Sequence, residues 1–196
     1  MPTTFIYIHG FLSSPKSTKA QQLAAYLREN HPDIDYVVPA LPETPRQAYA
    51  VAEAAVQSAL AKKSQVGLIG SSMGGFYGTV LAERFGLRAV IINPSVKPHL
   101  SIRKYLGTHR NPYSGAEFSI GLDDALALEA MALARLKCPE NYWLLAQTGD
   151  EVLDYRDAVE FYQGARQTIE PGGDHQFRHF DRHLPALIKF LQFAAV

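Results

Sequence analysis

Cysteine is nearly absent from this chain, in which Cys138 is the one thiol among 196 residues. A single thiol cannot form an intramolecular disulfide, so a disulfide-stabilised fold is excluded and an oxidising compartment is not required. Net charge is missing too, since 19 Lys and Arg balance 19 Asp and Glu. A balanced surface gives no general attraction to nucleic acid or to an anionic membrane, and we expect neither as a partner.

Long hydrophobic runs are absent as well. No stretch approaches the roughly 18 apolar residues that a membrane-spanning helix needs. The opening residues, MPTTFIYIH, carry no basic segment, and their apolar run is too short for a signal peptide. We therefore expect a cytoplasmic protein, while nothing in the sequence indicates an oligomeric state.

The chain does contain enough apolar residues, 47%, for a sizeable core, and its length suits one domain over residues 1–196. Short runs of β-branched and other apolar residues are typical of strands buried on both faces of a parallel sheet. The candidate strands are residues 5–8, 36–38, 66–69, 89–92, 142–146 and, more weakly patterned, 166–169.

Helical patterns alternate with these runs. They cover residues 18–30, 44–63, 73–85, 123–136, 155–163 and 181–193. Strand and helix alternation predicts an α/β fold, a mostly parallel sheet of about six strands with helices on both faces. Residues 94–122 are the exception, because they are rich in Pro, Gly, Ser, Asn and His and have no clear period. With the helix that follows, we expect a lid-like insertion over about 94–136 that covers the site.

The motif with the clearest chemistry is GSSMG at residues 70–74, between a predicted strand and a predicted helix. This context is the one that G-x-S-x-G needs to form a nucleophile elbow, in which a serine occupies a strained turn between small neighbours. Ser72 fits the pattern as the nucleophile. Ser71 does not, because Ile69 stands two residues before it instead of glycine.

An early loop in such a fold supplies the second amide of an oxyanion hole. His9 and Gly10 follow the first predicted strand, and the glycine lets the backbone turn inward. The expected oxyanion donors are the backbone amides of Phe11 and Met73.

The acid and the base should follow the nucleophile in the order Asp or Glu, then His. Asp150 comes first after the strand at 142–146 and is favoured over Glu151 and Asp154. His175 follows two glycines in a loop before the last predicted helix. In this arrangement His175 accepts the Ser72 proton, and Asp150 fixes its tautomer.

A metal site is the alternative interpretation of the same region. His175, His179 and His183 are spaced by four residues, and on one continuous helix they would line one face and could bind zinc or nickel. The glycines before His175 and the predicted helix N-cap at Asp181 argue against one helix. We therefore expect no metal and no cofactor.

With these residues placed, the chain resembles the α/β-hydrolase superfamily along its full length, and most of all the small bacterial YqiA-type esterases. The resemblance is carried by YIHGF at 7–11, GSSMGG at 70–75, TGDEVLDY at 148–155 and GGDH at 172–175. It implies hydrolysis of carboxylic esters, with acyl-CoA thioesters as a further substrate class. It also implies Ser72, Asp150 and His175 as nucleophile, acid and base.

Two other functions stay open at this point. The fold could serve as a non-catalytic binding module that keeps the triad as a relic. The same triad could also cleave an amide, a lactone or a C–C bond. Candidate substrate contacts are the aromatic residues Phe11, Tyr77, Tyr105 and Tyr113, which could line an acyl pocket, and the cations Lys97, Arg103, Lys104 and Arg110, which could meet a phosphate-bearing leaving group.

Overall fold

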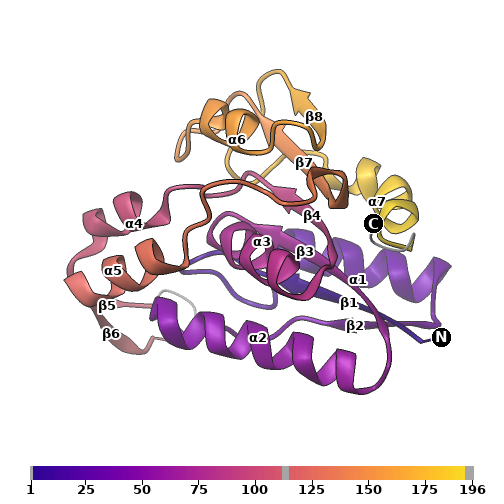
Figure 1. Ribbon diagram of the computed structural model, residues 1–196, viewed down its shortest axis with the longest axis horizontal. Helices are drawn as coiled ribbons and strands as arrows, with labels where there is room; N and C mark the ends of the chain where they lie inside the picture. The colour runs from indigo at the N-terminus through magenta and orange to yellow at the C-terminus, as the bar shows by residue number, and fades with distance from the viewer. Residues whose placement is uncertain (1, 112–114, 193–196) are drawn as a thin grey trace.

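The computed structural model describes residues 2–111 and 115–192 (Figure 1). Its strands are β1 (Thr3–Ile8), β2 (Ile34–Val37), β3 (Gln65–Ser71), β4 (Arg88–Ile92), β5 (Gly107–Arg110), β6 (Glu117–Ile120), β7 (Tyr142–Gln147) and β8 (Arg166–Glu170). Its longer helices are α1 (Thr18–Asn30), α2 (Pro45–Ala61), α3 (Met73–Phe85), α5 (Leu122–Met131), α6 (Tyr155–Phe161) and α7 (Leu184–Gln192).

The central sheet has six strands in the order β2-β1-β3-β4-β7-β8, and every neighbouring pair is parallel. Its side chains alternate between two apolar cores, as the pleat of a strand requires. In β1, Ile6 and Ile8 face the core shared with α2, α3 and α6, while Phe5 and Tyr7 face the core shared with α1 and α7. Helices therefore cover both faces, and the predicted α/β class with about six strands is confirmed.

All six predicted strands of this sheet are present, with ends within two residues of the prediction. The helices at 18–30 and 73–85 have the predicted bounds. Two helices differ. The helix expected over 123–136 ends at Met131, because Ala132 takes an extended conformation with ψ 137°. The helix expected from Asp181 begins at Leu184, and Asp181 lies in a preceding 3-10 turn, η3 (Phe180–His183), so it is not an N-cap.

Residues 94–122 contain more regular structure than the sequence indicated. They form a short helix, α4 (Pro98–Ser101), a 3-10 turn, η1 (Ile102–Tyr105), and an antiparallel hairpin of β5 and β6. The hairpin, α4 and α5 lie together at the end of the molecule opposite the N-terminus (Figure 1). Ile102, Ile120 and Leu128 are almost fully buried in the core that also contains α2 and α3. The insertion is thus packed onto the domain, and its role as a lid stays a prediction.

Among the described residues, no helix has both the length and the apolar character needed to cross a bilayer.

Candidate active site

Ser72 occupies a single-residue turn between β3 and α3. Its φ of 57° and ψ of −122° are values that a residue with a side chain rarely adopts. The turn is held by its neighbours: the Ser72 amide donates to the Ile92 carbonyl at 3.0 Å, and the Ser72 carbonyl accepts from the Ser95 amide at 3.1 Å. The sheet and the following loop thus hold the strained backbone that presents the hydroxyl.

Gly70 and Gly74 are required by the close approach of the chain on both sides of this turn. A methyl group at Gly70 would collide with the Gly74 carbonyl, and one at Gly74 would collide with the Ile8 and His9 carbonyls. These obstacles are backbone atoms, which cannot move aside as the end of a flexible side chain can. The two glycines of the motif are therefore explained by packing alone.

Replacing Gly74 by alanine is expected to lower the free energy of unfolding by about 3 kcal/mol, since overpacking against backbone forces the turn to shift. Gly78, one turn further along α3, is the matched control, because its added methyl group would make only ordinary contacts, the nearest at 3.6 Å to the Ile91 side chain. Gly78→Ala should be neutral or stabilising by up to about 1 kcal/mol, because alanine favours the helix. Urea unfolding of both variants checks this, and equal effects would contradict it.

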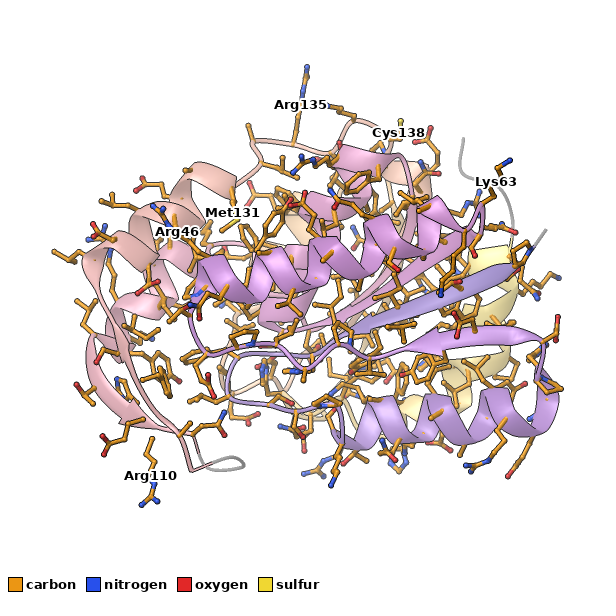
Figure 2. All side chains as sticks on the ribbon, turned by 90° about the horizontal axis from the view of Figure 1, so that it is seen from below. Arg46, Lys63, Arg110, Met131, Arg135 and Cys138 are labelled. Carbon is orange, nitrogen blue, oxygen red and sulfur yellow. The ribbon has the colours of Figure 1, made fainter. Side chains whose placement is uncertain are left out.

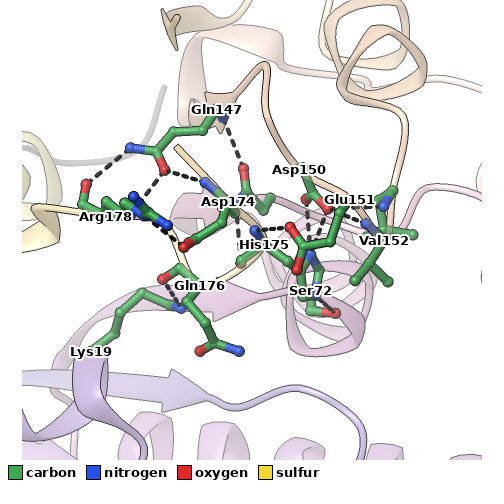
Figure 3. A network of polar contacts seen from close by, with 12 residues as sticks. Lys19, Ser72, Gln147, Asp150, Glu151, Val152, Asp174, His175, Gln176 and Arg178 are labelled. Atoms are coloured by element: carbon green, nitrogen blue, oxygen red, sulfur yellow. Dashed lines mark hydrogen bonds and ion pairs between the residues drawn. The ribbon is translucent and has the colours of Figure 1, made fainter. Parts of the chain in front are cut away.

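The His175 imidazole bridges Ser72 and Asp150. Its Nε2 lies 3.0 Å from Ser72 Oγ, and its Nδ1 lies 2.8 Å from Asp150 Oδ2 (Figure 3). The serine follows β3, the aspartate follows β7 and the histidine follows β8, so all three stand at the carboxyl edge of one parallel sheet. Ligand sites of open α/β sheets lie at this edge.

The Asp150 carboxylate is positioned to accept hydrogen bonds. Its side chain is only 2% exposed, and its Oδ1 accepts from the backbone amides of Val152 and Leu153, both at 2.9 Å. Because an ionised carboxylate only accepts, the proton between the two groups belongs to His175 Nδ1. The lone pair of Nε2 then faces the Ser72 hydroxyl, which is the orientation that a general base needs.

Three polar residues hold the histidine loop: Asn93 and Gln147, which the sequence prediction missed, and Glu151, which it weighed only as a possible acid. The side-chain amide of Asn93 donates to the carbonyls of Asp174 and His175, at 3.0 and 3.2 Å. The Gln147 side-chain oxygen accepts from the Asp174 amide at 3.2 Å, and Glu151 accepts from the His175 amide at 3.0 Å. Asn93 follows β4 and Gln147 ends β7. A polar residue at the carboxyl end of a buried strand was therefore the sequence signal that could have identified both as residues of the site.

The loop after β1 approaches the serine closely. A methyl group at Gly10 would lie 3.1 Å from Ser72 Cβ. Within residues 2–111 and 115–192, neither the Phe11 amide nor the Met73 amide donates a hydrogen bond. Two N–H groups that keep their hydrogen available fit the predicted oxyanion donors, and that assignment stays a prediction.

His9 fixes this loop through both ring nitrogens. Its Nε2 accepts from the Leu41 amide at 3.2 Å, and its Nδ1 lies 3.0 Å from the Gly10 carbonyl. Burial lowers the pKa of His9, because desolvation disfavours the imidazolium. A neutral ring is what these two contacts require, since one nitrogen donates and the other accepts.

The competing candidates have other partners. Asp154 caps α6 and pairs with Arg156, and Glu170 pairs with His183 at 2.9 Å. Asp154 therefore belongs to a helix terminus and not to the histidine. No group of three metal-ligating side chains occurs in the described parts of the chain.

A cavity of about 310 Å³ opens beside the serine and the imidazole. It is lined by Tyr7, His9, Gly10, Phe11, Leu12, Ser13, Lys16, Ser17, Thr18, Lys19, Ser71, Ser72, His175 and Gln176. Phe11 is the one predicted aromatic contact in this lining. Tyr105 packs edge-on against Phe11 at 5.2 Å between ring centroids, and Tyr77 is buried against Phe76. Tyr113 lies outside the described residues.

The cations suggested for a leaving group lie elsewhere. Lys97 pairs with Asp157 at 2.8 Å, and Lys97 and Lys104 line a separate cavity. Arg110 projects outward from the hairpin (Figure 2), where it donates to the Gly115 carbonyl. Arg103 is exposed and is absent from the lining of the serine cavity. None of these four side chains lines the cavity beside Ser72.

This geometry can be compared with known proteins. A family model described as "Uncharacterised protein family (UPF0227)" matches residues 4–192. The chain belongs to this family. The match spans the serine turn, the aspartate and the histidine, so the UPF0227 sequence pattern covers every element that carries the candidate site.

Solved structures similar to this UPF0227 chain are α/β hydrolases. A protein described as a putative hydrolase from Agrobacterium vitis S4 is 18% identical, with a TM-score of 0.71 over 97% of this chain and 88% of that one. Est1E from Butyrivibrio proteoclasticus is 15% identical, with a TM-score of 0.70 over 96% and 86%. XC6422 from Xanthomonas campestris, described as an a/b serine hydrolase without lid, is 15% identical, with a TM-score of 0.66 over 98% and 84%. At these identities the likeness shows the fold.

Proposed function

We propose that this chain is a serine hydrolase that cleaves carboxylic esters through an acyl-enzyme, with acyl-CoA thioesters as a further substrate class. The observation that carries the proposal is the continuous set of contacts from Asp150 through His175 to the Ser72 hydroxyl. The fold alone would also be compatible with a non-catalytic binding module. A buried carboxylate, an imidazole oriented by it and a serine in a strained turn are not needed together for packing, so their combination favours catalysis.

The proposed reaction begins when Ser72 Oγ attacks the acyl carbonyl carbon while its proton passes to His175 Nε2. The carbonyl oxygen becomes an oxyanion, which we expect the Phe11 and Met73 amides to stabilise together with the positive end of α3. His175 then gives its proton to the departing alkoxide or thiolate, and the acyl group remains on the serine. A water molecule, deprotonated by the same nitrogen, releases the acid and restores the hydroxyl.

Similar proteins support this assignment. One solved structure of Est1E is described as having ferulic acid bound, and XC6422 is described as a serine hydrolase. Both descriptions concern those proteins, and they agree with the chemistry proposed here.

Labelling with a fluorophosphonate tests the proposal without any choice of substrate. An activated Ser72 should attack phosphorus and displace fluoride, giving one adduct on the peptide that contains residue 72. Mass spectrometry of the digested protein locates the adduct, and heat-unfolded protein, in which the three groups have separated, should remain unlabelled. Folded protein that takes up no label between pH 6 and about 9 would favour a binding module.

A further inference from the structure

Lys19 is a buried cation that the proposed reaction does not use. It stands in the first turn of α1, is 7% exposed, and lines the same cavity as Ser72 and His175. Its ammonium donates one hydrogen bond, to the Gln176 carbonyl at 2.7 Å (Figure 3). In the described part of the chain it has no ion-pair partner. The ammonium can donate three hydrogen bonds and has one protein acceptor, so its hydrogen-bonding capacity is incompletely used.

The surroundings of Lys19 favour an anion. The cavity lining contains a second cation, Lys16, and the hydroxyl residues Ser13, Ser17 and Thr18, while no carboxylate belongs to it. The first turn of α1 has no acidic residue and no side-chain cap. The two carboxylates whose charges act on Lys19 form their ion pairs with other residues, Asp174 with Arg178 through Oδ2 at 2.7 Å and Asp150 with His175.

Lys19 stays charged at neutral pH. Burial lowers its pKa to about 8, and the Asp174 and Asp150 carboxylates oppose that decrease. A desolvated ammonium attracts an anion more strongly than one in water, because fewer water molecules screen it. A positive charge is thus held inside a cavity that ends at the candidate nucleophile.

From this geometry we infer that Lys19 binds an anionic group of the substrate, so that the preferred substrates are esters carrying a carboxylate or a phosphate near the scissile bond. This inference rests on the proposed function, because it gives a substrate class to the same serine. The cavity of about 310 Å³ is at the small end of ligand sites, which suits a compact anionic acyl or alcohol group. The competing explanation is that Lys19 only tethers Gln176, and with it the histidine loop.

Two pairs of esters separate these explanations. One pair differs in the acyl group, 4-nitrophenyl hemiglutarate against 4-nitrophenyl pentanoate. The other differs in the leaving group, the butyrate esters of 4-hydroxybenzoate and of its methyl ester. The carboxylate of each anionic ester tests whether the site binds an anion at all. Inhibition by inorganic phosphate is then compared with inhibition by glutarate, which shows which anion the site prefers. The spontaneous hydrolysis of each ester is subtracted from its measured rate, and kcat/KM is then compared within each pair.

In the wild type, the anionic ester of at least one pair should be preferred by tenfold or more, which corresponds to about 1.4 kcal/mol. Lys19→Met should lower kcat/KM for the anionic ester about tenfold more than for its neutral partner, which removes the preference, and Lys19→Arg should retain most of it. Lys62→Met, at the exposed end of α2, is the matched control and should change neither rate.

Equal or lower turnover of the anionic esters by the wild type would overturn the inference, even if Lys19→Met fails to fold. So would a Lys19→Met variant that slows both members of each pair equally, since that is the behaviour of a tether. Failure of all four esters together with absence of fluorophosphonate labelling would instead refute the serine hydrolase itself.

Discussion

Replacing Ser72 by alanine is expected to lower kcat for ester hydrolysis by about 10⁴- to 10⁶-fold, because among the described residues it is the Ser72 hydroxyl that contacts His175 Nε2. The fold should survive. The substitution removes one side-chain hydrogen bond, to His175, and stability should change by about 1 kcal/mol. Kinetics with 4-nitrophenyl butyrate and urea unfolding measure the two effects separately.

The matched control is Ser58→Ala. Ser58 is exposed in the middle of α2, away from the serine cavity, and alanine suits a helix. This variant should keep full activity. A Ser72→Ala protein that retains wild-type turnover would show that the chemistry occurs at another residue.

Asp150→Asn is expected to lower kcat by about 10⁴-fold through a change of tautomer. The Val152 and Leu153 amides both donate to Oδ1, so an asparagine must keep its oxygen there and place its NH₂ group towards His175 Nδ1. That NH₂ group donates, which forces Nδ1 to accept and moves the ring proton to Nε2. An imidazole that presents N–H to the serine cannot remove the hydroxyl proton.

Asp154→Asn tests the same chemical change at the competing carboxylate. Asp154 caps α6 and pairs with Arg156 on the surface, and asparagine is an equally good cap. Its activity should stay within about threefold of wild type. Comparable losses in the two variants would contradict the assignment of Asp150 as the acid. The pH dependence of the residual activity of Asp150→Asn distinguishes a changed base from a collapsed site.

The sheet was predictable because its strands are buried on both faces. In such strands nearly every residue is apolar, so a run such as residues 89–92 stands out without any periodicity. The right-handed connection of parallel strands then leaves few arrangements. Helix α1 was found from the spacing of Ala20, Leu23 and Leu27, which are all buried.

The insertion was not predictable in the same way. Strand β5 is mostly exposed and reads Gly-Thr-His-Arg, with no apolar alternation to mark it. Its structure comes from pairing with β6 and from the packing of Phe118 against Phe11. Helix α5 ends early although good helix formers follow, because the chain turns so that Leu136 enters the core and the Lys137 amide meets the Glu83 carboxylate. Tertiary contacts decide both features.

The serine, the aspartate and the histidine could be predicted from motifs, because each of them stands at a fixed distance in sequence from a glycine or from the end of a strand. The residues that position them carry no such signature. Asn93 and Gln147 each make more than one hydrogen bond to the backbone of the histidine loop, and these contacts join parts of the chain that are distant in sequence. Lys19 did leave a trace, since it shares a helix face with Leu23 and Leu27, where a solvated lysine is out of place.

The strand order has a consequence for the newborn chain. Synthesis delivers β1 to β4 first, and in the finished sheet these four strands are contiguous neighbours, with Ser72 at the carboxyl end of β3. β7 and β8 then add to one side only, and they bring the carboxylate and the imidazole. While the ribosome is still translating codons 73–174, the hydroxyl has no proton acceptor beside it. If the proposed function holds, an incomplete polypeptide should therefore be inactive until β7 and β8 have joined the sheet.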